Sequence, residues 1–321
     1  MKIISFNSYK GGACRTTTCY NTLPFLAKEL GATEKQPILV FDVDLDSMGM
    51  TNLLDKPDNF RNSKYSANNL FVRDRDGICA RIQNGFDEEG DLEDYYSLFN
   101  RVGNELGLED DGAVLFCGVD SALSNFSDDT FKSVYDEVNS PLGKLISALN
   151  DLDDDEKPKA LIFDCAAGMQ MSTVMVMEKV DTMVMCMRPT YQFRAGTKHY
   201  IIQRIPQKLR YQQLSDPRRL VLVPTAVAPC GEDSPKDILK LRNEAYRGIL
   251  QMRNLTDTYD VDDLGYRFVD DMIDGVDTMG IPEVERFKWQ EEGTLYKVEE
   301  CTPQEEKLKS RYIKLAEVIK G

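Results

Sequence analysis

A segment between residues 8 and 18 combines glycines, cations and hydroxyls in the order of a phosphate-binding loop, reading Ser-Tyr-Lys-Gly-Gly-Ala-Cys-Arg-Thr-Thr-Thr. Gly11 and Gly12 permit a ligand to approach the backbone closely, and Lys10 and Arg15 supply positive charge. A helical pattern begins at once, so unpaired backbone N–H groups and the helix dipole would converge on one anion. The segment therefore predicts phosphate binding. The alternative is a tight turn that uses its glycines for geometry alone.

Three carboxylates follow two apolar runs of strand length. Asp42 and Asp44 come at the end of one run, and Asp164 ends another. Because the carboxyl ends of parallel strands meet at the sheet edge where ligands of such folds bind, we expect these side chains to converge near the loop. With the hydroxyl of Thr16, they would supply oxygen ligands for the magnesium ion of a nucleotide. The alternative is that Asp42 or Asp164 caps a neighbouring helix.

The elements that position these residues follow from the hydrophobic pattern. Several short runs are apolar on consecutive positions, which is typical of strands covered on both faces of a parallel sheet; they are 2–6, 37–42, 113–117, 159–164, 182–187 and 219–224. Amphipathic stretches of helical spacing lie near 16–30, 130–149, 171–179, 193–204, 236–250 and 304–320. The expected fold is α/β, a doubly wound and mostly parallel sheet with helices on both faces. We expect one domain over residues 1–321, with surface insertions near 84–112 and 254–280.

Composition excludes several classes of function. The chain has 321 residues, 39 basic and 54 acidic, and a formal net charge of −15, which argues against a surface that binds DNA or anionic membrane as a whole. A single histidine excludes a histidine dyad and a multi-histidine metal centre. Eight cysteines without a CxxC pair indicate reduced thiols and a cytoplasmic protein. Charged residues interrupt the longest apolar stretches, so no membrane span is expected.

The loop resembles the deviant Walker A motif of the ParA/MinD class of P-loop ATPases, usually written KGGxGK(T/S)T. It is most similar to a ParA-like subgroup with SYKGGVGRT followed by DxDLEAPGL, patterns that residues 8–16 and 42–50 match in part. Three later segments resemble the Walker B and switch II segment, the next strand-to-helix junction and an Ile-Pro element near the base; they are 164–168, 187–197 and 281–283. The resemblance implies a SIMIBI-type P-loop fold.

The resemblance also implies roles. ATP would be bound by Lys10, Gly11, Gly12, Ala13, Cys14, Arg15, Thr16 and Thr17 of the loop, with Thr225 and Pro282 beside the rest of the nucleotide. Magnesium would be held by Thr16, Asp42 and Asp164. Lys10 corresponds to the signature lysine, which often acts across a dimer interface, and Asp44 would position the attacking water. The implied function is slow ATP hydrolysis that drives an ATP-dependent homodimerisation switch and regulates a protein partner.

Two loop residues depart from the general pattern. Arg15 replaces a lysine and brings a wide planar fork in place of a compact ammonium, although the subgroup shares it. Cys14 replaces a glycine, and its side chain could crowd the loop or force an unfavourable φ. Cys14 therefore leaves open a nucleotide-binding scaffold or regulatory subunit that does not hydrolyse ATP. A small-molecule kinase or ligase of the same superfamily, similar to dethiobiotin synthetase, is a further alternative, but the Lys10 signature favours a switch protein.

Residues 194–219 are locally basic. Seven cations stand against Asp216 alone, a net charge of +6 (7 minus 1); they are Arg194, Lys198, Arg204, Lys208, Arg210, Arg218 and Arg219. Basic residues in the C-terminal half of ParA-type partition ATPases bind DNA non-specifically, so the stretch suggests the same. The alternatives are a solvated helix face and a docking surface for an acidic partner.

The C-terminal stretch 304–320 has apolar residues at helical spacing. MinD-like proteins use a terminal amphipathic helix on membranes. Acidic residues interrupt the basic face of this stretch, so we expect a helix packed on the sheet and no membrane binding.

Overall fold

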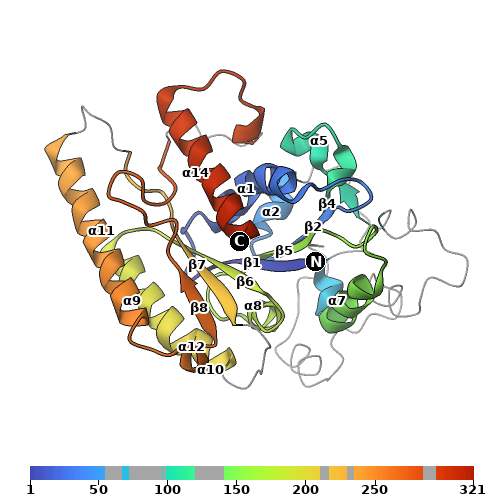
Figure 1. Cartoon of the computed structure of the whole chain (residues 1–321), viewed down its shortest axis with the longest axis horizontal. Coiled ribbons are helices and arrows are strands. Elements are labelled where there is room, and N and C mark those ends of the chain that lie inside the picture. Colours follow the sequence, from blue (N-terminus) through green and yellow to red (C-terminus); the bar gives the residue numbers. More distant parts are fainter. Residues whose placement is uncertain are drawn as a thin grey trace, which may run out of the picture.

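The computed structural model describes residues 1–54, 67–71, 96, 99–119, 141–209, 217–229, 235–284 and 294–321. Figure 1 shows one central twisted sheet with helices on both of its faces. The predicted strands form where consecutive positions are apolar, because both faces of the sheet are covered; all six residues of Ile38–Val43, for example, are buried.

The sheet has eight strands in the order β3-β4-β2-β5-β1-β6-β7-β8. All neighbouring strands are parallel except β3, which runs antiparallel to β4 at one edge. The strands are β1 (Lys2–Ser8), β2 (Ile38–Val43), β3 (Asn100–Arg101), β4 (Val114–Cys117), β5 (Ala160–Cys165), β6 (Thr182–Met187), β7 (Arg218–Pro224) and β8 (Tyr266–Val269). This arrangement confirms the predicted doubly wound, mostly parallel α/β fold.

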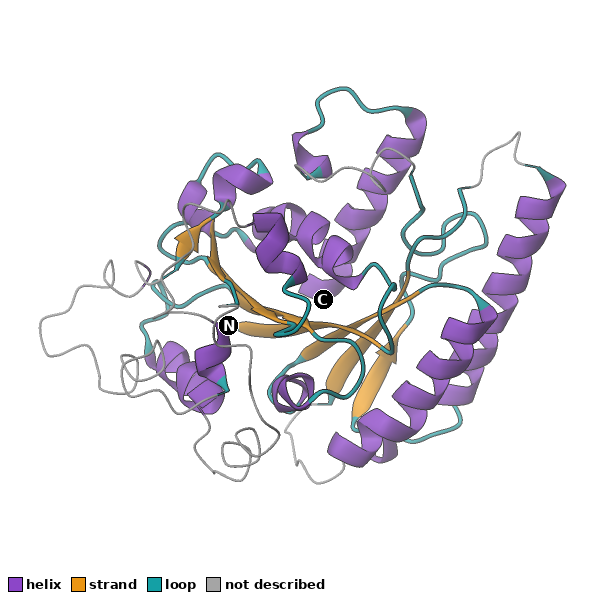
Figure 2. Cartoon of the chain, turned by 180° about the vertical axis from the view of Figure 1, so that it is seen from behind, coloured by secondary structure: helices purple, strands orange, loops and turns teal. Residues whose placement is uncertain are grey.

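Two helical layers cover the sheet, and each shares a separate hydrophobic core with it (Figure 2). One layer contains α1 (Arg15–Leu30), α2 (Gly49–Leu54), α5 (Gly103–Leu106) and α14 (Pro303–Lys320). The other contains α7 (Pro141–Asp151), α8 (Met171–Met177), α10 (Ile205–Leu209), α11 (Lys236–Thr256) and α12 (Val261–Leu264). Helix α9 (Tyr191–His199) follows β6 and continues through a π-helical turn, Tyr200–Arg204, into α10. Short 3-10 turns are Ala67–Leu70, Asp111–Ala113 and Leu295–Lys297.

Strand register brings the predicted acids together. Asp42 on β2 is the direct partner of Asp164 on β5, and Phe6 on β1 pairs with Asp164 from the other side. Strand β1, which leads into the glycine loop, lies between β5 and β6. The loop and both acids therefore lie at the same carboxyl edge of the sheet.

The two stretches expected to be surface insertions contribute to the sheet. Within 84–112, residues 84–95, 97 and 98 lie outside the described part, whereas the remainder includes β3 and α5. Within 254–280, β8 extends the sheet beside β7, with Tyr266 completely buried. A polar, Asp-rich sequence surrounds this short edge strand and hides its pattern. Of the helix expected over 130–149, residues 130–140 also lie outside the described part.

The C-terminal helix α14 packs along α1. A capping box between Thr302 and Glu305 fixes its start. Its buried residues include Leu308, Tyr312, Leu315, Ala316 and Ile319, and the Tyr312 ring stacks on Phe25 with centroids 6.5 Å apart. The apolar face is thus covered by the protein's own core, as expected for a packed helix. Among the described helices, none has the length and apolar character needed to cross a bilayer.

Candidate functional site

Residues 9–14 connect β1 to α1 and leave their backbone open. Gly12 has a φ of 78°, a left-handed conformation that favours glycine. Apart from chain neighbours, no heavy atom lies within 4 Å of where a Cβ on Gly11 or Gly12 would be. The N–H of Thr18 makes the first helical bond, to the Cys14 carbonyl at 2.9 Å, so earlier N–H groups lack an intrahelical acceptor. This geometry suits an anion at the start of a helix.

Cys14 occupies the strained position of the loop. It immediately precedes α1 with φ 54° and ψ 29°, in the left-handed region, where a side chain costs roughly 1–2 kcal/mol relative to right-handed backbone. Of the two effects that the sequence suggested, the unfavourable φ is the one observed. The Sγ atom accepts a weak hydrogen bond of 3.9 Å from Nη2 of Arg188.

Arg15 turns its guanidinium onto the acids at the sheet edge. Its Nε donates to Oδ1 of Asp164 at 2.7 Å, and its Nη2 donates to Oδ2 of Asp44 at 2.8 Å. The same Nη2 lies 3.2 Å from Oγ1 of Thr16. Arg15 is only 8% exposed, so these ion pairs are shielded from water.

Asp42 is held by a different set of partners. Its Oδ2 accepts from both the N–H and the hydroxyl of Thr51 at 2.8 Å, and its Oδ1 accepts from the N–H of Asp44 at 3.1 Å. Burial, and secondarily the charge of Asp164, raises the pKa of Asp42 to about 7. Burial also raises the pKa of Asp164, although the charge of Arg15 acts against it. An added cation would favour the charged form of both acids.

The oxygen atoms of Thr16, Asp42 and Asp164 suit a magnesium ion that also binds phosphate and water, rather than a metal ion held by protein side chains alone. Oδ2 of Asp164 is buried without a hydrogen-bond partner, and the hydroxyl of Thr16 lies near the same acid cluster through its contact with Arg15. Within the described part of the chain, no three His, Cys, Asp or Glu side chains are grouped so that they could hold a metal ion. Magnesium typically takes one or two carboxylates and completes its shell with phosphate and water oxygens. Thr16, Asp42 and Asp164 fit that pattern.

Lys10 contacts helix α9. Its Nζ is 4.4 Å from the centroid of the Phe193 ring on α9, a cation–π contact. The neighbouring Tyr9 ring packs edge-on against Tyr200 with centroids 6.2 Å apart. A Cβ on Gly196 would lie 2.1 Å from that Tyr9 ring, so α9 requires glycine there. Tyr191, at the start of α9, is 80% exposed.

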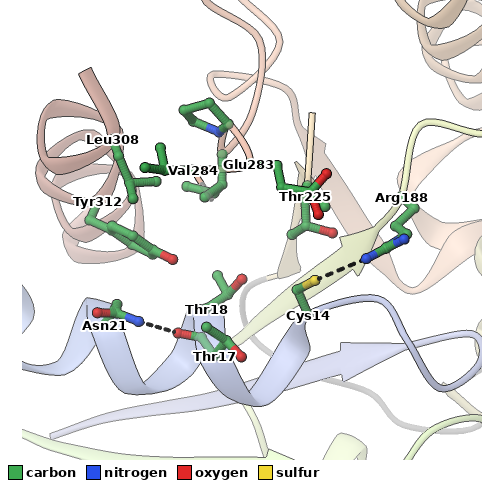
Figure 3. A pocket seen from close by; sticks show the side chains of 13 residues that line it. Cys14, Thr17, Thr18, Asn21, Arg188, Thr225, Glu283, Val284, Leu308 and Tyr312 are labelled. Carbon is green, nitrogen blue, oxygen red and sulfur yellow. Dashed lines mark hydrogen bonds between the residues drawn. The ribbon is translucent and has the colours of Figure 1, made fainter. Parts of the chain in front are cut away.

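A cavity of about 220 Å³ opens beside the start of α1. Figure 3 shows its labelled side chains arranged around a common space, from α1 on one side to α14 on the other. The lining includes four residues predicted to bind nucleotide, which come from three separate segments: Cys14, Thr17, Thr225 and Pro282. The structure therefore brings these predicted residues together next to the loop.

Hydrogen bonds connect the cavity walls to the loop. Oγ1 of Thr225 donates to the Ala13 carbonyl at 2.7 Å. The segment with Pro282 pairs with Val227, and the N–H of Ile281 donates to the Pro224 carbonyl at 2.8 Å. The wall that carries Pro282 is therefore fixed to the end of β7.

Comparison with solved structures identifies the fold. Over 100% of this chain and 96% of the other, it is similar to the ATP complex of an McdA variant from Cyanothece, with a TM-score of 0.60 and 14% identity. It is also similar to pNOB8 ParA bound to nonspecific DNA, with a TM-score of 0.51 and 14% identity over 99% of this chain and 94% of the other. A third similar structure is the septum site-determining protein MinD of Pyrococcus horikoshii with Mg-ADP, with a TM-score of 0.51 and 16% identity over 99% of this chain and 95% of the other. The chain has the fold of the ParA/MinD ATPases. No family model matches the sequence, and no curated protein matches it.

Within this ParA/MinD fold, the cavity lining also includes residues that were not predicted as nucleotide contacts, among them Asn21, Arg188 and Tyr312. Asn21 donates to the Thr17 carbonyl at 3.0 Å, and Arg188, directly after β6, and Tyr312 on α14 line the same space (Figure 3). Nε of Arg188 is buried without a hydrogen-bond partner. Asn21 lies on α1 with Thr17, whereas Arg188 and Tyr312 are far from the loop in the sequence, so spacing gave no signal for those two. Arg188 does lie in the junction 187–197 that resembles the family.

In the described part of the basic stretch 194–219, only some of the cations are exposed. Arg194 and Arg219 donate to backbone carbonyls, and Arg218 is only 2% exposed. Arg210 and Asp216 lie outside the described residues. In the described part of the stretch, the exposed cations are Lys198, Arg204 and Lys208.

Proposed function

We propose that this protein binds ATP with magnesium at the loop 9–17 and hydrolyses it slowly. The observation that carries the proposal is the open backbone at Gly11 and Gly12, which leads directly into α1 beside the three acids. Preorganised N–H groups and cations are what phosphoryl transfer asks of a protein. The ParA/MinD fold and the ATP and Mg-ADP held by two similar structures support the same nucleotide.

Different parts of the site would bind different parts of the nucleotide. Backbone N–H groups of residues 11–17 bind the phosphates, with Lys10 and Arg15 as the cations. The rest of the nucleotide would enter the 220 Å³ cavity against Thr225 and Pro282. Its volume is modest, and its lining of methyls, a proline and a tyrosine suits a planar apolar ring.

Thr16, Asp42 and Asp164 would hold the magnesium ion. When bound, the ion would neutralise charge on the phosphate oxygens. Thr51 and the Asp44 backbone orient Asp42 through three hydrogen bonds, so its carboxylate is fixed in advance. Asp44, with one oxygen on Arg15 and the other 3.2 Å from the N–H of Ser47, would position the attacking water.

We further propose that hydrolysis drives a homodimerisation switch that acts on a protein partner. Lys10 is partly exposed and lies over Phe193 of α9, the helix whose first residue, Tyr191, is exposed, so we place the contact with a second copy here. All eight strands belong to one sheet, which supports a single domain. The described cysteines are free thiols, which supports a reducing compartment such as the cytoplasm.

Light scattering of the purified chain with ATP, ADP or no nucleotide, read beside phosphate release, tests the proposal. We expect twice the monomer mass with ATP only and slow phosphate release in the same sample. A mass that does not depend on nucleotide would contradict the switch.

A nucleotide-binding scaffold without hydrolysis is the second candidate, and the left-handed Cys14 favours it. A strained residue at the phosphate loop could hold ATP in a geometry that does not react. ATP binding without any phosphate release would support this candidate.

DNA binding is a third candidate. Lys198, Arg204 and Lys208 are the exposed cations of the described part of 194–219, and one similar structure, pNOB8 ParA, is bound to nonspecific DNA. Three cations predict weak binding, and the logarithm of the binding constant should fall linearly with the logarithm of the salt concentration. Binding that does not depend on salt would exclude phosphate contacts as its cause.

A further inference from the structure

The guanidinium of Arg15 occupies the same cluster of oxygens that we assign to the metal. It contacts Oδ1 of Asp164 and Oγ1 of Thr16, two of the three proposed ligands, and also Oδ2 of Asp44. The side chain is 8% exposed and Asp164 is completely buried. Arg15 is therefore the cation that balances these acids in the structure.

A divalent cation and this guanidinium cannot both bind the cluster as it stands. Arg15 holds Oδ1 of Asp164 and leaves only the buried Oδ2 to a metal, and two cations a few ångströms apart in a site shielded from water repel each other strongly. Phosphate offers Arg15 an equivalent partner, because a guanidinium pairs with phosphate oxygens as readily as with carboxylates.

We infer that Arg15 keeps the metal site closed in the nucleotide-free protein and opens it by moving to the nucleotide phosphates. This inference rests on the proposed function, since it takes the acids as magnesium ligands and phosphate as the ligand of the loop. It has one direct consequence: a divalent cation binds the acids only when nucleotide arrives with it, and metal alone does not load the site.

The arrangement of donors explains why an arginine serves here. Its fork lets Nε and Nη2 reach two carboxylates at once, whereas a lysine offers one compact charge. Asp42 stands outside this pair, because Thr51 and the Asp44 N–H occupy its oxygens. The third ligand thus keeps its orientation when Arg15 leaves.

Titration of the nucleotide-free full chain with Mn²⁺, followed by the EPR signal of free Mn²⁺, tests the inference. Arg15→Met removes the charge and keeps an unbranched side chain, and we expect it to bind Mn²⁺ at least 10-fold more tightly than wild type. Arg194→Met is the matched control, since it removes an arginine that donates only to backbone carbonyls in the described structure, and it should bind Mn²⁺ as wild type does. Equal binding by wild type and Arg15→Met, or an equal gain in Arg194→Met, would overturn the inference.

Loss of Arg15 leaves two buried carboxylates without their partner, which destabilises the fold. Thermal melts of Arg15→Met and of Arg15→Gln, with and without Mn²⁺, test the inference even if these variants are less stable than wild type. Mn²⁺ should raise the Tm of both variants by several degrees and leave that of wild type unchanged, because the metal replaces the lost cation. A Tm that Mn²⁺ does not move in the variants would contradict the inference.

ATP titration of wild type in the presence of magnesium separates this inference from the proposed function. Absence of ATP binding there would contradict the proposed function, whereas the Mn²⁺ titrations report on Arg15 and the acids without any nucleotide.

Discussion

Nε of Arg15 lies 2.7 Å from Oδ1 of Asp164, with side-chain exposures of 8% and 0%. The pair joins the start of α1 to the end of β5, so the phosphate loop and the acids at the sheet edge form one electrostatic unit. Removing one member of a buried ion pair costs about 3–5 kcal/mol. Loss of Arg15 alone should therefore destabilise the fold, and we infer that the same contact controls which cation the acids bind.

Asp44→Ala should retain ATP binding and lose turnover. The Asp44 carboxylate accepts hydrogen bonds from Arg15 and from the Ser47 N–H, and its proposed task is to position water. Loss of a group with such a role lowers rates by roughly 10²–10⁴-fold. Measurements of phosphate release and of ATP affinity check the expected loss of turnover and the expected retention of binding. Turnover equal to wild type would refute the assignment of Asp44.

Cys14→Gly should relieve strain in the loop. Glycine adopts φ 54° without the penalty of a side chain, so phosphate release should increase if strain slows hydrolysis. Cys14→Ala is the control, because it removes the thiol and keeps the Cβ. If the glycine variant is no faster than the alanine variant, backbone strain at residue 14 does not limit turnover.

Gly196→Ala should act through Tyr9. The new methyl would overlap the Tyr9 ring and force it out of its contact with Tyr200. In a Tyr9→Ala background the same change should stabilise the helix by about 0.5–1 kcal/mol. We expect the two substitutions to be non-additive by about 0.5–1.5 kcal/mol in urea unfolding. Additive effects would show that the ring moves freely.

Asp274 and Arg311 should make stability depend on acid pH. Burial acts to raise the pKa of Asp274, but hydrogen bonds and charge from Arg311 outweigh it and hold that pKa below its ordinary value. The carboxylate therefore contributes stability above about pH 4, and this contribution is lost as pH falls through the lowered pKa. The side chain is 36% exposed, so Asp274→Asn should cost no more than about 1 kcal/mol at pH 7.

Unfolding of Asp274→Asn and wild type at pH 7 and pH 3 measures this difference. It should shrink at the lower pH, whereas the exposed Asp155→Asn should show little difference at either pH. A difference that is constant with pH would exclude the ion pair as its source.

Arg311→Met should in turn weaken nucleotide binding. Arg311 donates to the Gly280 carbonyl at 2.9 Å and to Asp274 at 3.0 Å, so it fixes the segment that carries Pro282 into the cavity wall. We expect a several-fold rise in the Kd for ATP in a fluorescence titration, since the wall loses buried hydrogen bonds. An unchanged Kd would show that the β7 pairing alone positions Pro282.

The central strands were predictable because burial on both faces requires apolar residues at consecutive positions. Strand β8 was not predictable from the sequence, because it has only four residues at the sheet edge and one of them, Arg267, is exposed. Strand β3 is shorter still, with two residues. Edge strands bury too little side chain to leave a pattern in the sequence.

For the candidate site, spacing predicted which residues meet, but not where their side chains point. Asp42 and Asp164 lie side by side because strand ends in a parallel sheet must converge. The direction of Arg15 depends instead on the burial of two acids, Asp44 after β2 and Asp164 on β5, which a motif does not encode. Arg188, directly after β6, and Tyr312 on α14 join the cavity only after folding.

Calorimetric titration of wild type and Arg15→Ala with ATP and magnesium tests the central claim most directly. We expect saturable binding of one ATP per chain in wild type, and at least 10-fold weaker binding in Arg15→Ala, because one or more charge-assisted phosphate contacts are lost. Arg194→Ala is the matched control, as its guanidinium donates to backbone carbonyls. A wild-type chain that does not bind ATP, or an Arg15→Ala variant that binds it equally well, would contradict the account.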